Sequence, residues 1–269
     1  MAVLASDTAT KDAERRWFGH PPGLTILFLT EMWEKFSYFG MRALLIYYMT
    51  KALAMRQEDA SWVYGGYTSF AYFTPILGGL LADRWLGRRR AVILGGSIMA
   101  VGHFLMAFPA LFYPALATIA IGNGFFLPSL PSQVGHLYAA DDPRGNTAFS
   151  VYYVGINLGA VLAPLVCGTL GELYGWHYGF GAAGVGMCLG LVIYVLGGRY
   201  LPAAAAAVQP WVPGAPNDEH SFARRFGLLL GVIAIIVVFR GAYEQIGNTV
   251  ALWADADVDR SAGLGWTIP

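Results

Sequence analysis

Charged residues are scarce in this sequence. Asp, Glu, Lys and Arg make up 13% of its 269 residues, and 56% are hydrophobic, whereas soluble domains typically carry about 25% charged residues. This composition excludes an ordinary soluble domain, and we expect an integral membrane protein. Acidic and basic residues balance to a net charge of zero, so no overall field attracts nucleic acid, and we expect no such partner.

Cysteine is nearly absent as well. Cys167 and Cys188 lie in apolar runs, where a free thiol behaves as a small buried hydrophobic residue, so we expect neither a disulfide nor a metal site. His103, also within an apolar run, has no second histidine or carboxylate at the spacing of a metal site or a catalytic triad. We therefore expect no metal, no cofactor and no enzyme activity.

Long polar segments are missing from most of the chain. A helix of about 20 apolar residues spans the hydrocarbon core of a bilayer. Seven apolar stretches of at least roughly this length follow one another, near residues 22–50, 60–83, 90–108, 112–138, 146–172, 178–200 and 223–253. Several are longer than needed, which predicts tilted helices rather than further crossings. The predicted fold class is all-α integral membrane.

The distribution of Lys and Arg predicts the orientation. With a cytoplasmic N-terminus, eleven of the seventeen fall inside: Lys11, Arg15, Arg16, Arg84, Arg88, Arg89, Arg90, Arg144, Arg199, Arg224 and Arg225. Lys51, Arg56 and Arg260 fall outside, and the other three lie within helices. Because cytoplasmic loops are enriched in positive charge, the N-terminus is predicted to be inside.

Composition also divides the chain. Residues 1–21 carry charges before any apolar core begins, unlike a signal peptide, and are predicted to be a cytoplasmic tail. Residues 201–222, rich in alanine and proline, are a predicted cytoplasmic linker. Between them lies a predicted six-helix bundle, 22–200, and after them a seventh helix and loop, 223–269.

The first apolar stretch contains a stripe of polar side chains: Glu31, Glu34, Lys35, Tyr38 and Arg42. Their spacing places them on one face of a helix. A soluble amphipathic helix would explain the stripe, but the flanking residues 24–29 and 43–49 are apolar. Placing each charge at the bilayer centre costs roughly 2.5–3.5 kcal/mol of insertion free energy, so the stripe must face a bundle interior or a water-filled cavity. We predict that it borders a transport pathway.

The seventh stretch repeats this feature with Arg240, Glu244, Gln245 and Asn248. These positions also share one face of a helix. The same energetic cost predicts that this second stripe faces the cavity.

Glycine and proline positions predict how the helices pack. In the fourth stretch, Pro128 and Pro131 each delete a backbone hydrogen bond, which predicts a bend. In the fifth, Gly155 and Gly159 form a small-xxx-small pair that permits close helix contact. Asn157 lies between them, and its amide is expected either to bond to another helix or to contact a ligand.

The break between the second and third stretches combines Gly78 and Gly79 with Asp83, Arg84 and Arg88. A plain stop-transfer cluster accounts for the arginines but not for Asp83 or the glycine spacing. The segment resembles the cytoplasmic helix 2–3 loop of the major facilitator superfamily. That resemblance implies that Asp83, Arg84 and Arg88 bind neighbouring helix ends in one state of a transport cycle.

Further blocks resemble the proton-dependent oligopeptide transporter family within that superfamily. They follow the order of the family and lie at residues 20–23, 30–42, 64–68, 78–90, 152–159, 175–180 and 244–245. The family has twelve core helices in two six-helix halves. The resemblance implies the N-terminal six-helix bundle plus the first helix of the C-terminal bundle, and hence a fragment or a truncated product.

The resemblance also implies roles for individual residues. It implies that proton coupling involves Glu31, Glu34, Lys35 and Glu244. It implies that the substrate is bound by Lys35, Tyr38, Arg42, Tyr72, Asn157 and Glu244.

The chain departs from the family pattern at four of its positions. Lys35 replaces an arginine, Leu127 a lysine, Phe39 a tyrosine and Arg240 a tryptophan. Arg240 is expected either to supply the charge missing at Leu127 or to pair locally with Glu244.

The implied function is a proton-coupled symporter of di- and tripeptides that works by alternating access, with protons as the coupling ion and no cofactor. It would be a multi-pass protein of the plasma membrane or bacterial inner membrane, in contact with lipid, and a monomer when full length. Two alternatives stay open. The same fold could carry another small zwitterion or anion, or the chain could be a truncated membrane protein that does not transport.

Overall fold

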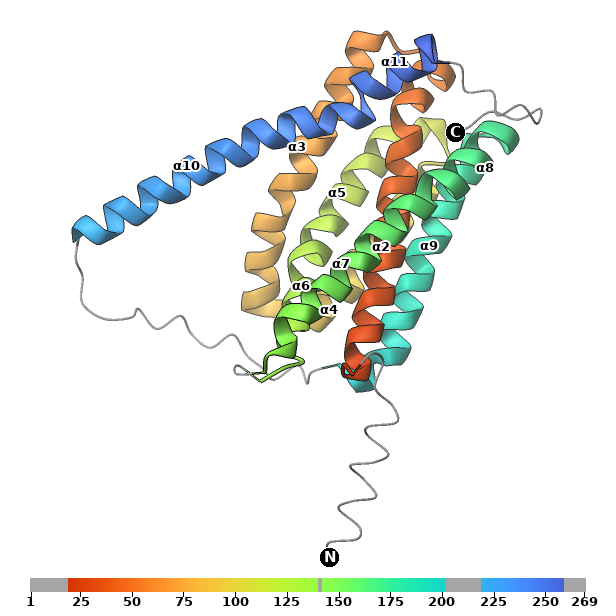
Figure 1. The fold of residues 1–269 in the computed structure, drawn as a ribbon. Helices are drawn as coiled ribbons and strands as arrows, with labels where there is room; N and C mark the ends of the chain where they lie inside the picture. Colours follow the sequence, from red (N-terminus) through yellow and green to blue (C-terminus); the bar gives the residue numbers. More distant parts are fainter. Residues whose placement is uncertain (1–18, 140–141, 202–218, 259–269) are drawn as a thin grey trace, which may run out of the picture.

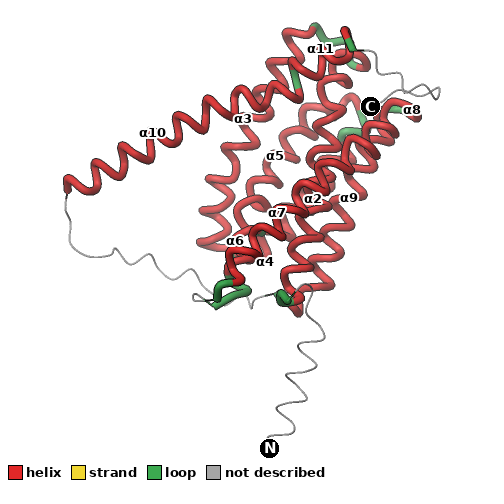
Figure 2. The backbone as a smooth tube through the Cα atoms, viewed as in Figure 1, coloured by secondary structure: helices red, strands yellow, loops and turns green. Residues whose placement is uncertain are grey.

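The computed structural model describes residues 19–139, 142–201 and 219–258, with side chains from residue 224 onward in the last range. The predicted linker, most of the predicted tail and the end of the predicted last loop lie outside the described residues. The division into four segments stays a prediction. Within the described ranges the chain is helical and contains no strand (Figure 2).

Seven long helices correspond to the seven predicted stretches: α2 (Pro22–Tyr47), α3 (Gln57–Leu81), α4 (Arg88–Leu105), α5 (Phe112–Ser129), α7 (Arg144–Ala163), α9 (Trp176–Leu196) and α10 (Glu219–Glu244). Shorter helices are α6 (Pro131–Gly135), α8 (Thr169–Tyr174) and α11 (Thr249–Asp257). Short π or 3-10 turns cover Tyr48–Ala52, Ala82–Leu86, Pro109–Leu111, Pro164–Gly168, Gly197–Tyr200 and Gln245–Gly247.

Four helical stretches within the described residues are long and apolar enough to cross a membrane: Pro109–Gly135, Arg144–Tyr174, Trp176–Tyr200 and Arg224–Asp257. Three of the seven expected spans therefore do not qualify by composition. They are α2, with charges along its middle, α3, which begins with acidic residues, and α4, which begins with arginines. Their polar residues lower the hydropathy of helices that stand beside the others (Figure 1).

The bundle is arranged around α2. Helices α7 and α9 pack against α2, α4 packs against α9 and α5, and α3 packs against α5. From one packed neighbour to the next, the helices therefore follow the order α7, α2, α9, α4, α5, α3, with α3 and α7 at the two ends. Helix α10 extends obliquely away from the bundle and meets it near the end where α2 finishes (Figure 1). There Tyr47 donates a hydrogen bond to the carbonyl of Ala251 at 2.9 Å, and Lys51 pairs with Asp255 at 2.6 Å.

Glycines permit the closest helix contacts. A Cβ added at Gly159 would collide with the backbone of Met32, and one at Gly155 would lie 2.9 Å from the carbonyl oxygen of Phe28. The predicted contact through this glycine pair is therefore confirmed, and it joins α7 to α2.

Proline explains the break in the fourth stretch. Helix α5 ends at Ser129 and α6 begins at Pro131, after Leu130. Pro131 has no N–H to donate to the preceding turn, so the regular hydrogen bonding cannot continue through it. The interruption lies at the second of the two prolines, because Pro128 is accommodated within α5, and the predicted bend itself stays a prediction.

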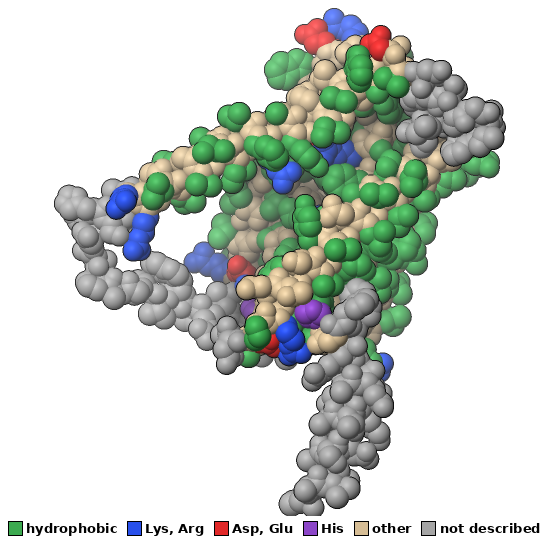
Figure 3. All heavy atoms as spheres, viewed as in Figure 1, with side chains coloured by type: hydrophobic (Ala, Val, Ile, Leu, Met, Phe, Trp, Pro, Cys, Tyr) green, Lys and Arg blue, Asp and Glu red, His purple; other side chains and the backbone are tan. Residues whose placement is uncertain are grey.

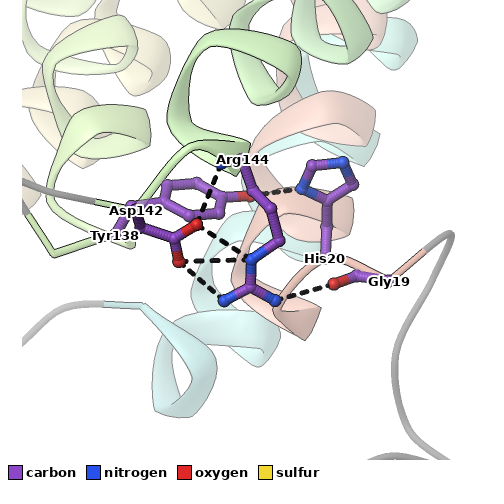
Figure 4. A network of polar contacts seen from close by, with 5 residues as sticks. All are labelled: Gly19, His20, Tyr138, Asp142 and Arg144. Atoms are coloured by element: carbon purple, nitrogen blue, oxygen red, sulfur yellow. Dashed lines mark hydrogen bonds and ion pairs between the residues drawn. The ribbon is translucent and has the colours of Figure 1, made fainter.

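A polar network ties the start of α2 to the segment that precedes α7 (Figure 4). The His20 Nδ1 atom lies 2.8 Å from the Tyr138 hydroxyl. Arg144 pairs with Asp142 at 2.7 Å and donates to the carbonyl of Gly19 at 3.0 Å. Asp142 thereby orients the arginine that links the two segments.

The Asp142 carboxylate predicts a pH-dependent contribution to stability. Its hydrogen bonds from Arg144 lower its pKa from 3.8 to about 2. A carboxylate with a lowered folded-state pKa stabilises the fold above its ordinary pKa, and this contribution is lost as the pH falls toward about 2. Asp142→Asn is therefore expected to lower the Tm at pH 7, with a difference from wild type that shrinks between about pH 4 and pH 2. Thermal unfolding in detergent measures this, and a difference that stays constant with pH would contradict it.

Candidate transport site

The polar stripe of α2 lies in the interior of the bundle. The exposed fractions of Glu34, Glu31 and Arg42 are 0%, 2% and 7%. The alternative of a solvated charge face on a soluble helix is therefore wrong. Burial of this kind requires charge partners, because an unpaired ion in a low-dielectric environment is strongly destabilising.

Lys35 is the partner of both acidic residues of the stripe. Its Nζ atom lies 2.7 Å from Glu34 Oε2 and 3.3 Å from Glu31 Oε1. One cation therefore serves two carboxylates, and the other carboxylate oxygen of Glu34 has no hydrogen-bond partner among the described residues. This group carries one more negative than positive charge when both acids are ionised.

Arg42 joins α2 to α10. Its guanidinium forms an ion pair with Glu244, and its Nε donates to the Tyr64 hydroxyl at 2.7 Å. The Tyr72 hydroxyl donates to the other oxygen of Glu244 at 2.8 Å. Two tyrosines of α3 thus hold the two ends of an ion pair between helices far apart in the sequence.

A cavity of about 310 Å³ lies beside these groups, between α2, α3, α5, α7 and α10. Its lining includes five of the predicted site residues: Glu31, Lys35, Tyr38, Arg42 and Tyr72. Glu34 and Glu244 do not line it, but each pairs with a cation that does. The structure therefore brings seven of the eight predicted proton-coupling and substrate-binding residues together.

Asn157 is the exception. It is exposed, and its amide donates to the carbonyl of Tyr153 in its own helix at 2.8 Å. The structure shows neither the interhelical bond nor the cavity position expected for it. Asn157 shares a helix face with Tyr153, which lines the cavity, but it lies one turn further along α7 and outside the lining.

Four tyrosines of the site were not predicted: Tyr64, Tyr152, Tyr153 and Tyr243. Tyr64 binds Arg42, and Tyr152 lies in the cavity lining together with Glu31. Both fall within sequence blocks that carried the family resemblance, but a tyrosine in an apolar helix gives no local signal that it will face an ion pair.

The departures from the family pattern lie at the cavity. Phe39, Leu127 and Arg240 all line it. Arg240 was expected to pair with Glu244 or to act in place of a missing cation. Glu244 instead pairs with Arg42 across helices, and Arg240 donates to the Tyr72 hydroxyl at 3.2 Å.

The predicted gating residues lie at the turn between α3 and α4. Gly87 has a φ of 75°, which suits glycine and allows the sharp turn. Across it Arg88 Nε lies 3.5 Å from Asp83 Oδ1, and another nitrogen of Arg88 lies 3.2 Å from His136 Nε2. Arg84 is exposed. Asp83 and Arg88 thus meet, and a gating role for the three residues stays a prediction.

Known proteins with similar sequences and structures agree with the family resemblance found in the sequence. Residues 89–206 match the PTR2 family model, described as the POT family. The uncharacterized transporter YclF of Bacillus subtilis (strain 168) is 39% identical over 246 residues, which cover 88% of this chain and 49% of the relative. A di-/tripeptide transporter of Lactococcus lactis subsp. lactis (strain IL1403) is 38% identical over 267 residues, covering 95% of this chain and 52% of the relative.

A solved structure of a mutant peptide transporter POT in complex with alafosfalin superposes with a TM-score of 0.69 at 38% identity. The match covers 94% of this chain and 53% of that chain. The chain thus spans about half the length of the curated relatives it matches. Because sequence, fold and the order of the motifs agree over nearly the whole chain, it is similar to the N-terminal part of POT family transporters and has their major facilitator type of fold.

Proposed function

We propose that this chain forms part of a proton-coupled symporter that carries di- and tripeptides by alternating access. The protein would be a multi-pass monomer in the plasma membrane or bacterial inner membrane, with a cytoplasmic N-terminus, protons as the coupling ion and no cofactor. Relatives named di-/tripeptide transporter and the solved peptide transporter complex support the substrate class.

One observation carries the proposal: fixed charges of both signs meet at one cavity inside the bundle. A peptide has an amino and a carboxyl terminus, so its site must offer both signs. Lys35 and Arg42 are the predicted carboxylate contacts, and Glu244 is the predicted contact of the amino group. Tyr38 and Tyr72 supply rings and hydroxyls for side chains and backbone.

Proton coupling would act through the same ion pairs. Lys35 lies between Glu34 and Glu31, so a proton on either acid weakens its hold on the lysine. Protonation of Glu244 would likewise release Arg42 from α10. Release of Arg42 changes the contact between α2 and α10, and both events change the charge at the cavity, which biases the equilibrium between inward-facing and outward-facing states.

Uptake of a labelled dipeptide into proteoliposomes under an imposed pH gradient tests the proposal. The protein encoded by the complete gene should accumulate the peptide when the outside is acidic. Glu34→Gln is expected to reduce gradient-driven uptake at least about tenfold, because its amide cannot exchange a proton, whereas counterflow of peptide without a gradient should be retained.

Asp59→Asn is a matched control, because Asp59 forms an exposed ion pair with Arg56 outside the cavity. Undiminished gradient-driven uptake by Glu34→Gln would eliminate Glu34 as a coupling site. Absence of any gradient-driven peptide uptake by the wild type would count against the symporter itself and favour a membrane protein that does not transport.

A second candidate is transport of another small zwitterion or anion by the same site. It is favoured by Phe39 and Leu127, which make two walls of the cavity apolar where the family pattern has polar groups. Competition by unlabelled dipeptides against a labelled amino acid derivative separates the two candidates. Peptides should compete strongly if they are the cargo.

A further inference from the structure

The ionisable side chains at the cavity are not all paired. Two of its cations are already held by carboxylates: Lys35 by Glu31 and Glu34, and Arg42 by Glu244. The third cation lining the cavity, Arg240, has no carboxylate within ion-pair distance in the described part of the chain. A substrate anion can therefore approach Arg240 without displacing a residue of the protein.

Neutral groups hold Arg240 in place. It donates one hydrogen bond to the Tyr72 hydroxyl at 3.2 Å, and its guanidinium lies 5.4 Å from the centre of the Tyr72 ring and 5.5 Å from that of Tyr243. The Tyr72 hydroxyl gives its own proton to Glu244, so it can only accept from Arg240. Stacking against rings orients a guanidinium without neutralising it.

Arg240 keeps N–H donors that can bind a carboxylate. A guanidinium has five N–H donors in a planar fork, and Tyr72 takes up one of them. The remaining donors can bind both oxygens of one carboxylate, which is the preferred geometry of this pair. Leu127, in the same lining, adds no charge that would compete. Figure 3 shows Lys and Arg side chains in the hollow beside α10.

We propose that Arg240 binds the terminal carboxylate of the substrate, while Lys35 and Arg42 stay with their glutamates. This assignment replaces Lys35 and Arg42 as the carboxylate contacts and rests on the proposed peptide transport. It also places substrate binding on α10, because Arg240 belongs to this helix and contacts the same tyrosine, Tyr72, that holds Glu244.

Binding of a dipeptide and of its C-terminal amide tests the assignment. Alanyl-alanine and alanyl-alanine amide differ by one negative charge and little in shape. Affinities are measured by calorimetry on the protein encoded by the complete gene, purified in detergent. Wild type is expected to bind the free acid about 10- to 100-fold more tightly, since a charge-assisted pair would be lost with the amide. Arg240→Gln should remove most of this preference and leave the affinity for the amide unchanged.

Two variants sharpen the experiment. Arg240→Lys keeps the positive charge but loses the planar fork of N–H donors, so it should retain part of the preference for the free acid. This variant replaces Arg240→Gln if Arg240→Gln does not fold. Arg56→Gln removes an exposed arginine outside the cavity and should bind both peptides as wild type does.

The outcomes separate this assignment from the proposed function. If Arg240→Gln keeps the full preference for the free acid, another cation binds the carboxylate and the assignment fails alone. If it weakens both peptides equally, Arg240 acts only by supporting the cavity, and the assignment again fails. If wild type binds neither peptide, the proposed peptide transport fails and the assignment falls with it.

Discussion

Replacing Arg42 with methionine is expected to lower the free energy of unfolding by about 3–5 kcal/mol and to abolish uptake. The substitution leaves Glu244 buried without its cation, and breaking one side of a buried pair costs about this much. It also removes the hydrogen bond to Tyr64. Since the pair joins α2 to α10, its loss should weaken the contact between the end of α10 and the bundle. Denaturant unfolding in detergent measures the first effect and proteoliposome uptake the second.

A double-mutant cycle identifies the cause. Glu244→Met in the Arg42→Met background should recover much of the lost stability, because no uncompensated charge remains. Lys51→Met is the control: Lys51 is exposed in its pair with Asp255, and its loss should cost less than about 1 kcal/mol. An Arg42→Met protein as stable as the control would show that the ion pair does not carry the contact between α2 and α10.

The second large effect concerns the contact between α3 and α5. A Cβ at Gly78 would collide with the backbone of Gly124 and lie 2.8 Å from the nitrogen of Phe125. Backbone cannot move aside as a flexible side chain can, so the two helices must separate. Gly78→Ala is expected to cost about 1–3 kcal/mol, and Gly78→Leu more. Because α3 carries Tyr64 and Tyr72, uptake should fall as well.

Gly66→Ala in the same helix is the matched control. No atom lies within 4 Å of a Cβ added there, and alanine is a better helix former than glycine by about 0.5–1 kcal/mol. It should therefore leave stability unchanged or raise it. Equal losses from the two substitutions would show that helix propensity, and not the close approach of α3 and α5, sets the cost. Thermal unfolding in detergent measures both.

Several features of the fold followed from sequence patterns alone. The positions of the long helices followed from apolar length, the break before α6 from Pro131, and the contact of α7 with α2 from Gly155 and Gly159. Burial of Glu31 and Glu34 followed from the cost of placing charge in a membrane. All of these depend on properties of one helix or one turn, which a sequence contains.

Other features needed the arrangement of helices in space. Sequence spacing suggested that Glu244 pairs with Arg240 one turn away, whereas it pairs with Arg42 of another helix and Arg240 contacts Tyr72. Spacing likewise did not show that Asn157 lies outside the cavity lining and bonds within its own helix. Helical periodicity tells which residues share a face, but not which neighbour that face meets.

The sequence by itself thus determined a bundle of helices with charges forced inward, because composition and periodicity act along the chain. The tertiary structure alone decided which charge each one meets. That choice depends on how α2, α3 and α10 cross, and hence on packing between residues distant in sequence. It left Lys35 and Arg42 paired and turned Arg240 toward the cavity with tyrosines as its neighbours.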